Sequence, residues 1–122
     1  MAEQALLATH GDPLVGRALV RTISSKFSVE HVFNLEQMLV HCRQREYGLY
    51  VMDLNLGYEA ALNIIPAQTI YALLQERGIE KLEKKFIGVS GASDVIEVAQ
   101  EEGLPAVLKT EFLDYFRRLF PR

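Results

Sequence analysis

Short apolar runs alternate along the chain with stretches in which apolar residues recur every three or four positions. The short runs predict buried strands at 5–9, 28–33, 47–53, 86–89 (leading to Ser90) and 106–108. The second of these runs is the weakest. The three-to-four periodicity predicts surface helices packed on a sheet, at 12–26, from Asn34 through Cys42, and at 66–77, 93–102 and 111–120.

The ends of these predicted helices carry residues with known capping preferences. Start signals are found at Asp12-Pro13, at Asn34, at Pro66 and at Ser93 or Asp94. Gly78 and Gly103 follow two of the helices, where glycine commonly ends a helix. The resulting order is βαβαβαβαβα, which predicts parallel strands joined by helical crossovers. The fold class is therefore α/β, a doubly wound five-stranded parallel sheet, in a single domain spanning 1–122.

Composition narrows the functional classes. The chain has 122 residues, of which 49% are hydrophobic, and this is enough for one buried core. The net charge of −3 gives no electrostatic reason to expect nucleic-acid binding. The one cysteine, Cys42, lies on an apolar helical stripe and is expected in the core. With no apolar run of membrane-spanning length and no basic start, we expect a cytoplasmic protein whose partner is a protein or a small ion.

Three strand ends carry side chains with chemistry. Asp53 closes the third predicted strand, Ser90 follows the fourth, and Lys109 follows the fifth. In an open parallel sheet the carboxyl ends of the strands line one crevice, so an acid, a hydroxyl and an amine can converge there. Such a trio suits the handling of a phosphoryl group.

The order of these residues resembles the receiver domain of two-component response regulators. The resemblance runs from Ala5 to Leu119, and the segments that carry it are 6–15, 51–56, 89–92 and 107–109. It implies a flavodoxin-like (βα)5 fold and a signalling role in a phosphorelay, without enzymatic activity of the chain itself. It further implies that Asp53 accepts a phosphoryl group from a histidine kinase, that Lys109 pairs with Asp53 or a phosphoryl oxygen, and that Ser90 donates to the phosphate.

The metal site of the family is only partly present. The resemblance assigns Mg²⁺ to Asp53, to the backbone carbonyl of Asn55 and to an acidic pair after the first strand, but His10 and Gly11 occupy the places of that pair. Asp12 remains nearby, where it also serves as a helix cap. Because Mg²⁺ prefers several hard oxygen ligands, we expect its affinity to be low and phosphorylation to be impaired.

Other positions also depart from the family pattern, and they too indicate an atypical receiver with impaired phosphorylation. Ala106 stands where an aromatic side chain usually reports phosphorylation, and Thr110 follows the lysine where proline is usual. The segment 57–65 is longer than the family's loop after the acceptor and is expected to cover the pocket or to offer a contact surface.

Alternatives remain for the site and for the whole chain. Asp53 suits a cap of the following turn, Ser90 an ordinary turn, and Lys109 a solvated strand end. His10 has no second His or Cys at ligand spacing, which argues against a zinc site. The chain as a whole also fits a pseudo-receiver, an interaction module that signals without phosphorylation. An aspartyl-phosphate hydrolase ranks last, because it expects a second Asp where Asn55 stands.

The last predicted helix is apolar around much of its circumference. Its apolar residues are Phe112, Leu113, Tyr115, Phe116, Leu119 and Phe120. Either this helix is deeply buried or part of it forms an interface. The resemblance favours a homodimer through Phe112, Tyr115, Phe116 and Phe120.

Overall fold

The chain forms five strands and five α-helices in strict alternation, as seen in a computed structural model that describes residues 3–10, 13–57 and 66–121. The strands are β1 (Gln4–Ala8), β2 (Ser28–Val32), β3 (Leu49–Asp53), β4 (Phe86–Ser90) and β5 (Ala106–Leu108). The helices are α1 (Pro13–Ile23), α2 (Leu35–Gln44), α3 (Pro66–Glu76), α4 (Ser93–Glu101) and α5 (Phe112–Leu119). Two short 3₁₀ turns, η2 (Leu82–Lys84) and η3 (Lys109–Glu111), precede β4 and α5.

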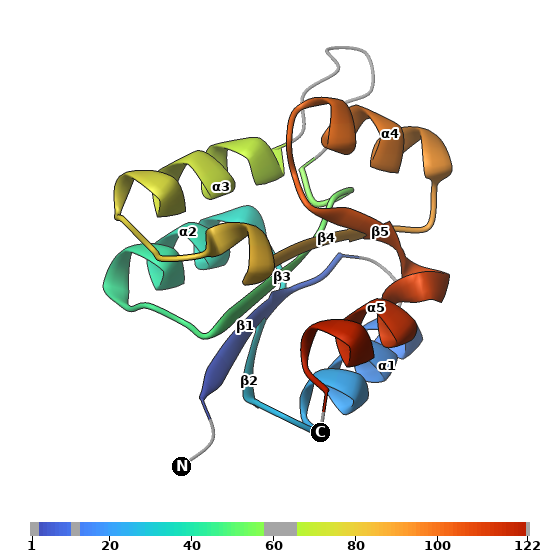
Figure 1. Cartoon of the computed structure of the whole chain (residues 1–122). Helices are drawn as coiled ribbons and strands as arrows, with labels where there is room; N and C mark the ends of the chain where they lie inside the picture. The colour runs from blue at the N-terminus through green and yellow to red at the C-terminus, as the bar shows by residue number, and fades with distance from the viewer. Residues whose placement is uncertain (1–2, 11–12, 58–65, 122) are drawn as a thin grey trace.

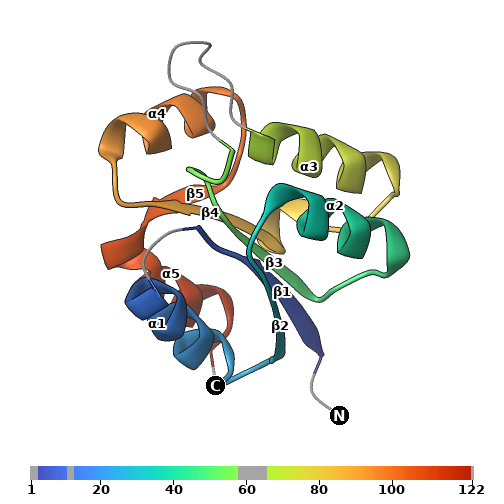
Figure 2. The same cartoon turned by 180° about the vertical axis from the view of Figure 1, so that it is seen from behind.

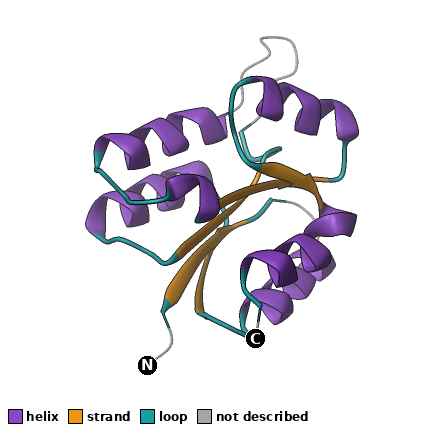
Figure 3. Ribbon diagram, in the orientation of Figure 1, coloured by secondary structure: helices purple, strands orange, loops and turns teal. Residues whose placement is uncertain are grey.

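All strand pairs are parallel, in the order β2-β1-β3-β4-β5. Helices α1 and α5 cover one face of the sheet, and α2, α3 and α4 cover the other (Figures 1 and 2). Figure 3 shows the sheet as a single twisted layer between the two groups of helices. The predicted doubly wound α/β architecture is confirmed.

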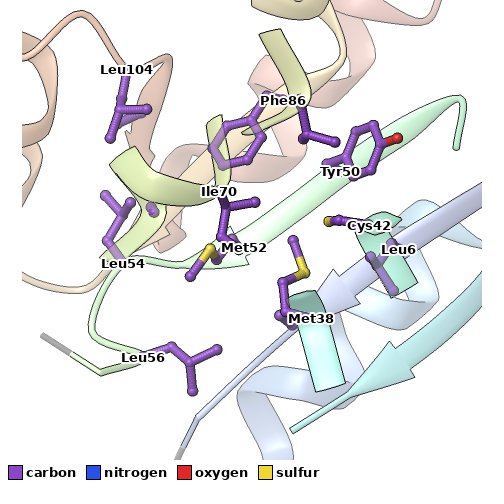
Figure 4. Close-up of a cluster of buried hydrophobic side chains, with 14 of the residues drawn as sticks. Leu6, Met38, Cys42, Tyr50, Met52, Leu54, Leu56, Ile70, Phe86 and Leu104 are labelled. Atoms are coloured by element: carbon purple, nitrogen blue, oxygen red, sulfur yellow. The ribbon is translucent and has the colours of Figure 1, made fainter. Parts of the chain in front are cut away.

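Two apolar clusters hold the layers together, one on each face of the sheet. Successive residues of β1 point to opposite faces, so Leu6 joins the cluster under α2, α3 and α4 while Leu7 joins the cluster under α1 and α5. The first cluster, shown in Figure 4, packs Met38 of α2 and Ile70 of α3 against Met52 of β3. The central strand β3 is buried on both faces, which is why its sequence is a continuous apolar run without polar alternation.

Most of the predicted helix signals act as expected. The Asn34 side chain accepts a hydrogen bond from the Gln37 N–H at 2.8 Å, which caps α2. Gly78 and Gly103 adopt φ values of +75° and +84° after α3 and α4, in the left-handed region that favours glycine. Cys42 is fully buried, and burial raises the pKa of its thiol to about 12. This places it in the core, as predicted.

Other boundaries differ from the predictions. The first helix ends at Ile23 rather than near Lys26, and a tight turn follows in which the Phe27 N–H donates to the Ile23 carbonyl. Helix α4 starts at Ser93, but its cap position is Ala92 and neither predicted side chain caps it. In the described residues no helix combines the length and the hydropathy needed to cross a bilayer.

Candidate functional site

Asp53 lies at the carboxyl end of β3 and is 2% exposed. Its Oδ1 atom accepts a hydrogen bond from the Asn55 N–H at 2.9 Å, the side-chain-to-backbone bond of an Asx turn. The simpler interpretation of Asp53, a cap on the following turn, is therefore correct for one of its two oxygens. The other oxygen is available for a different contact.

Lys109 supplies that contact. It follows β5, and its Nζ atom lies 2.9 Å from Asp53 Oδ2, which makes a charge-assisted hydrogen bond between residues 56 positions apart in the chain. The Lys109 side chain is only 23% exposed. The alternative in which Lys109 is a solvated strand end is therefore wrong.

Ser90 completes the group without touching Asp53 directly. It is fully buried at the end of β4, and its Oγ atom lies 3.3 Å from Asn55 Oδ1, to which it donates. The same Oγ accepts the Ala92 N–H at 3.1 Å, so Ser90 also shapes the turn into α4. The predicted convergence of Asp53, Ser90 and Lys109 at one edge of the sheet is present in the structure.

Asn55 is the member of this group that the sequence analysis undervalued. Its backbone N–H binds Asp53 and its side-chain oxygen accepts from Ser90, so one residue joins the two strand ends. The available signal was its position two residues after a strand-end Asp, the spacing of an Asx turn. We call Asp53, Asn55, Ser90 and Lys109 the Asp53 site.

The described residues offer few ligands to a magnesium ion. Asp53 is the one carboxylate in the Asp53 site, and both of its oxygens already accept hydrogen bonds from protein groups. His10 is exposed, and no cluster of three His, Cys, Asp or Glu side chains occurs in the part of the chain that the structure describes. Mg²⁺ is usually held by one or two carboxylates and several waters, and the one carboxylate described here is already paired with Lys109. Gly11, Asp12 and residues 58–65 of the long connection lie outside the described residues.

The last helix does not present the surface that the sequence suggested. Phe112 and Phe116 are each 2% exposed and belong to the core under α1 and α5, so they cannot line a dimer interface. The amphipathic pattern of α5 points these two rings at the sheet. Tyr115 and Phe120 are partly buried against the same cluster, and Leu113 is 42% exposed. Dimerisation stays a prediction, and of the four residues predicted for its interface only Tyr115 and Phe120 keep exposed surface.

The comparisons with known proteins agree on the fold. No protein-family model and no curated protein matches the chain. Among solved structures, the BeF3-activated receiver domain of DrrB superposes with a TM-score of 0.68 and 14% sequence identity, covering all of both chains. A CheY-like response regulator receiver domain from Methylobacillus flagellatus gives a TM-score of 0.62 and 18% identity, covering 98% of this chain and 99% of that one. The resemblance read from the sequence is thus confirmed at the level of architecture: this chain has the fold of response regulator receiver domains over its whole length.

Proposed function

We propose that the chain is a receiver-type signalling domain in which Asp53 accepts a phosphoryl group from a histidine kinase, with low efficiency. The observation that carries the proposal is the contact of 2.9 Å between Lys109 Nζ and Asp53 Oδ2 at the carboxyl edge of a receiver fold. A fixed positive charge next to a carboxylate supports the proposal, because the resemblance to receiver domains assigns the phosphoacceptor to Asp53. A cytoplasmic location and a kinase partner belong to the same proposal.

The chemistry follows from the groups present. A carboxylate oxygen of Asp53 attacks the phosphorus atom, the bond from phosphorus to the donor imidazole breaks, and an acyl phosphate forms. The Lys109 ammonium then faces a phosphoryl oxygen instead of the carboxylate and offsets the added negative charge. Ser90 can turn its hydroxyl from Asn55 Oδ1 toward the phosphoryl group.

Two features of the site reduce the expected efficiency. Asp53 is almost completely buried and its oxygens are already paired, so the incoming group must displace existing contacts. The described donor set also lacks the additional carboxylates that would hold a divalent ion. We therefore expect slow modification that reaches low occupancy.

The test is chemical phosphorylation of the purified chain. Incubation with acetyl phosphate and millimolar Mg²⁺, followed by intact-mass measurement, should show a minor species heavier by one phosphoryl group. Asp53→Asn should abolish it, and Ser90→Ala should lower it. Beryllofluoride should shift the amide resonances around residue 53 in NMR spectra of the wild type alone. Modification that persists in Asp53→Asn would place the chemistry elsewhere and reject the proposal.

A second candidate, an interaction module that works without phosphorylation, has its own supporting observation. Ala106, which is 6% exposed in β5, offers no side-chain rotamer that could report the state of Asp53. Complete absence of response to acetyl phosphate and to beryllofluoride, in a chain that remains folded, would favour this second function over the first.

A further inference from the structure

A pocket separate from the Asp53 site lies beyond the carboxyl ends of β1 and β2 and runs along α1. Its volume is about 720 Å³, within the range of small-molecule sites. We call it the α1 pocket. The residues that matter for its chemistry are Thr9, Gly16, Arg17, Arg21, His31 and Phe33. None of the four residues of the Asp53 site lines it.

His31 forms a fixed wall of the α1 pocket. Its Nε2 atom lies 2.7 Å from Thr9 Oγ1, and its Cε1 atom lies only 3.3 Å from where a Cβ of Gly16 would be. Glycine inside a helix is unfavourable by itself, and here it allows the imidazole to pack directly on the backbone of α1. Burial lowers the pKa of His31, so the ring is mainly uncharged at neutral pH.

An exposed aromatic ring continues this wall. Phe33 follows β2, is 62% exposed, and lies with its ring centroid 4.3 Å from that of His31 at an interplanar angle of 35°. A large aromatic side chain gains little stability in such a position. The two rings are therefore stacked at a tilt, and the exposed Phe33 ring is left to offer an aromatic surface to a planar ligand.

Two cations also line the α1 pocket. Arg17 and Arg21 are one helical turn apart on α1 and are both exposed. No carboxylate of the described residues lies within ion-pair distance of either guanidinium, and no described acidic residue lines the pocket. Like charges at this spacing repel each other, and an anion between them would relieve that repulsion. Guanidinium groups bind carboxylate and phosphate oxygens in forked geometry.

We infer that the α1 pocket binds a small planar aromatic molecule that carries an anionic group, with the ring stacked on Phe33 and the anion at Arg17 and Arg21. The inference does not depend on phosphorylation of Asp53. It gives the chain a ligand site separate from the predicted phosphoacceptor.

NMR titration of the ¹⁵N-labelled chain tests this inference with defined probes. The probes are 2-naphthoate, an aromatic carboxylate, and AMP, an aromatic phosphate. We expect at least one of them to shift the amides of Gly16, Arg17, His31 and Phe33 in a saturable way. 2-Naphthalenemethanol and adenosine lack the anionic group, and cyclohexanecarboxylate lacks the planar ring. Each should bind about tenfold more weakly than the matching probe, which is the usual effect of losing one charge-assisted or stacking contact. Which of the two anionic probes binds identifies the acid group.

Variants assign the contacts. Arg17→Ala and Arg21→Ala should each weaken binding about tenfold, and Phe33→Ala severalfold. Arg43→Ala and Val40→Ala, at exposed positions of α2, are the matched controls and should change nothing. Asp53→Asn should bind the probes like the wild type, which separates this result from the test of phosphorylation. The inference would be overturned if charged and neutral probes bound equally well, or if the Arg17→Ala/Arg21→Ala double variant kept full binding. It would also be overturned if neither anionic probe gave saturable shifts.

Discussion

The Asp53 site and the α1 pocket lie at the same edge of the sheet but are built in opposite ways. In the Asp53 site a buried carboxylate is paired with a lysine, and the hydroxyl of Ser90 is bonded on both sides. In the α1 pocket, Arg17 and Arg21 face solvent beside an exposed aromatic ring. A ligand must break protein contacts to enter the first, whereas it displaces mainly water from the second. Changes in the first should therefore affect folding, and changes in the second should affect binding.

Removal of the lysine from the Asp53 site should have the largest effect. Lys109→Met leaves the Asp53 carboxylate buried at 2% exposure without its charge partner, and we expect a loss of about 3 kcal/mol in the free energy of unfolding. Chemical denaturation measures this loss. The exposed Lys84→Met is the control and should cost less than about 0.5 kcal/mol. Adding Asp53→Asn to Lys109→Met should restore part of the stability, because the buried charge is then gone. Equal losses in the free energy of unfolding for the two lysine variants would show that the Lys109–Asp53 pair is exposed to water in the folded chain.

Adding a methyl group at Gly88, beneath the Asp53 site, should have the next largest effect on stability. A Cβ at Gly88 would lie 2.6 Å from Leu54 Cδ2 and 3.0 Å from Leu54 Cγ, and Leu54 is fully buried directly after Asp53. Gly88→Ala should therefore lower the free energy of unfolding by about 2 kcal/mol through overpacking. Gly91→Ala is the matched control, because nothing lies within 4 Å of its Cβ position. If the Gly88→Ala protein were as stable as the Gly91→Ala protein, the Leu54 side chain would be able to move and make room for the added methyl group.

The difference between the two regions also explains what the sequence could predict. Asp53, Ser90 and Lys109 were identifiable because each ends an apolar strand, and the parallel topology then forces the strand ends together. Asn55 was harder to value, because its role depends on a turn geometry that periodicity does not encode. The α1 pocket was not predicted at all. His31 and Gly16 are 15 positions apart, and only the packing of α1 on the edge strand β2 brings them together.

The last helix shows a second limit of sequence patterns. Six apolar residues within 112–120 indicate either burial or an interface, and the composition alone does not distinguish between the two. Contacts with residues far away in sequence decide the matter. The Phe27 ring lies 6.3 Å from that of Phe116 and 5.1 Å from that of Phe120, so a turn after α1 covers part of α5. The apparent excess of apolar surface is largely taken up within the chain.

A methyl group in the wall of the α1 pocket should have a much smaller effect than one beneath the Asp53 site. Gly16→Ala gains helix propensity of up to about 1 kcal/mol, and it presses on His31 Cε1 from 3.3 Å. Because the imidazole borders a pocket, the ring can move by a few tenths of an ångström, and we expect a net change below about 1 kcal/mol in the free energy of unfolding. NMR shifts of the His31 ring should report that movement. A loss as large as that of Gly88→Ala would show that this wall is as closely packed as the core.

The smallest effect concerns the charge state of His31. Burial lowers the pKa of this imidazole from its ordinary value of 6.5. The unfolded chain then takes up a proton more readily than the folded chain, so His31 contributes its full stability above pH 6.5 and loses it as the pH falls toward the lowered value. Denaturation curves between pH 5 and 8 should show this loss in the wild type and a flatter profile in His31→Gln. His10, Arg17 and Arg21 line the same pocket and are present in both proteins, so the difference between the two profiles belongs to the His31 imidazole. Identical profiles would mean that the ring is solvated in both states. An anion bound beside the ring favours its protonated form, so saturating 2-naphthoate should bring the wild-type profile closer to that of His31→Gln.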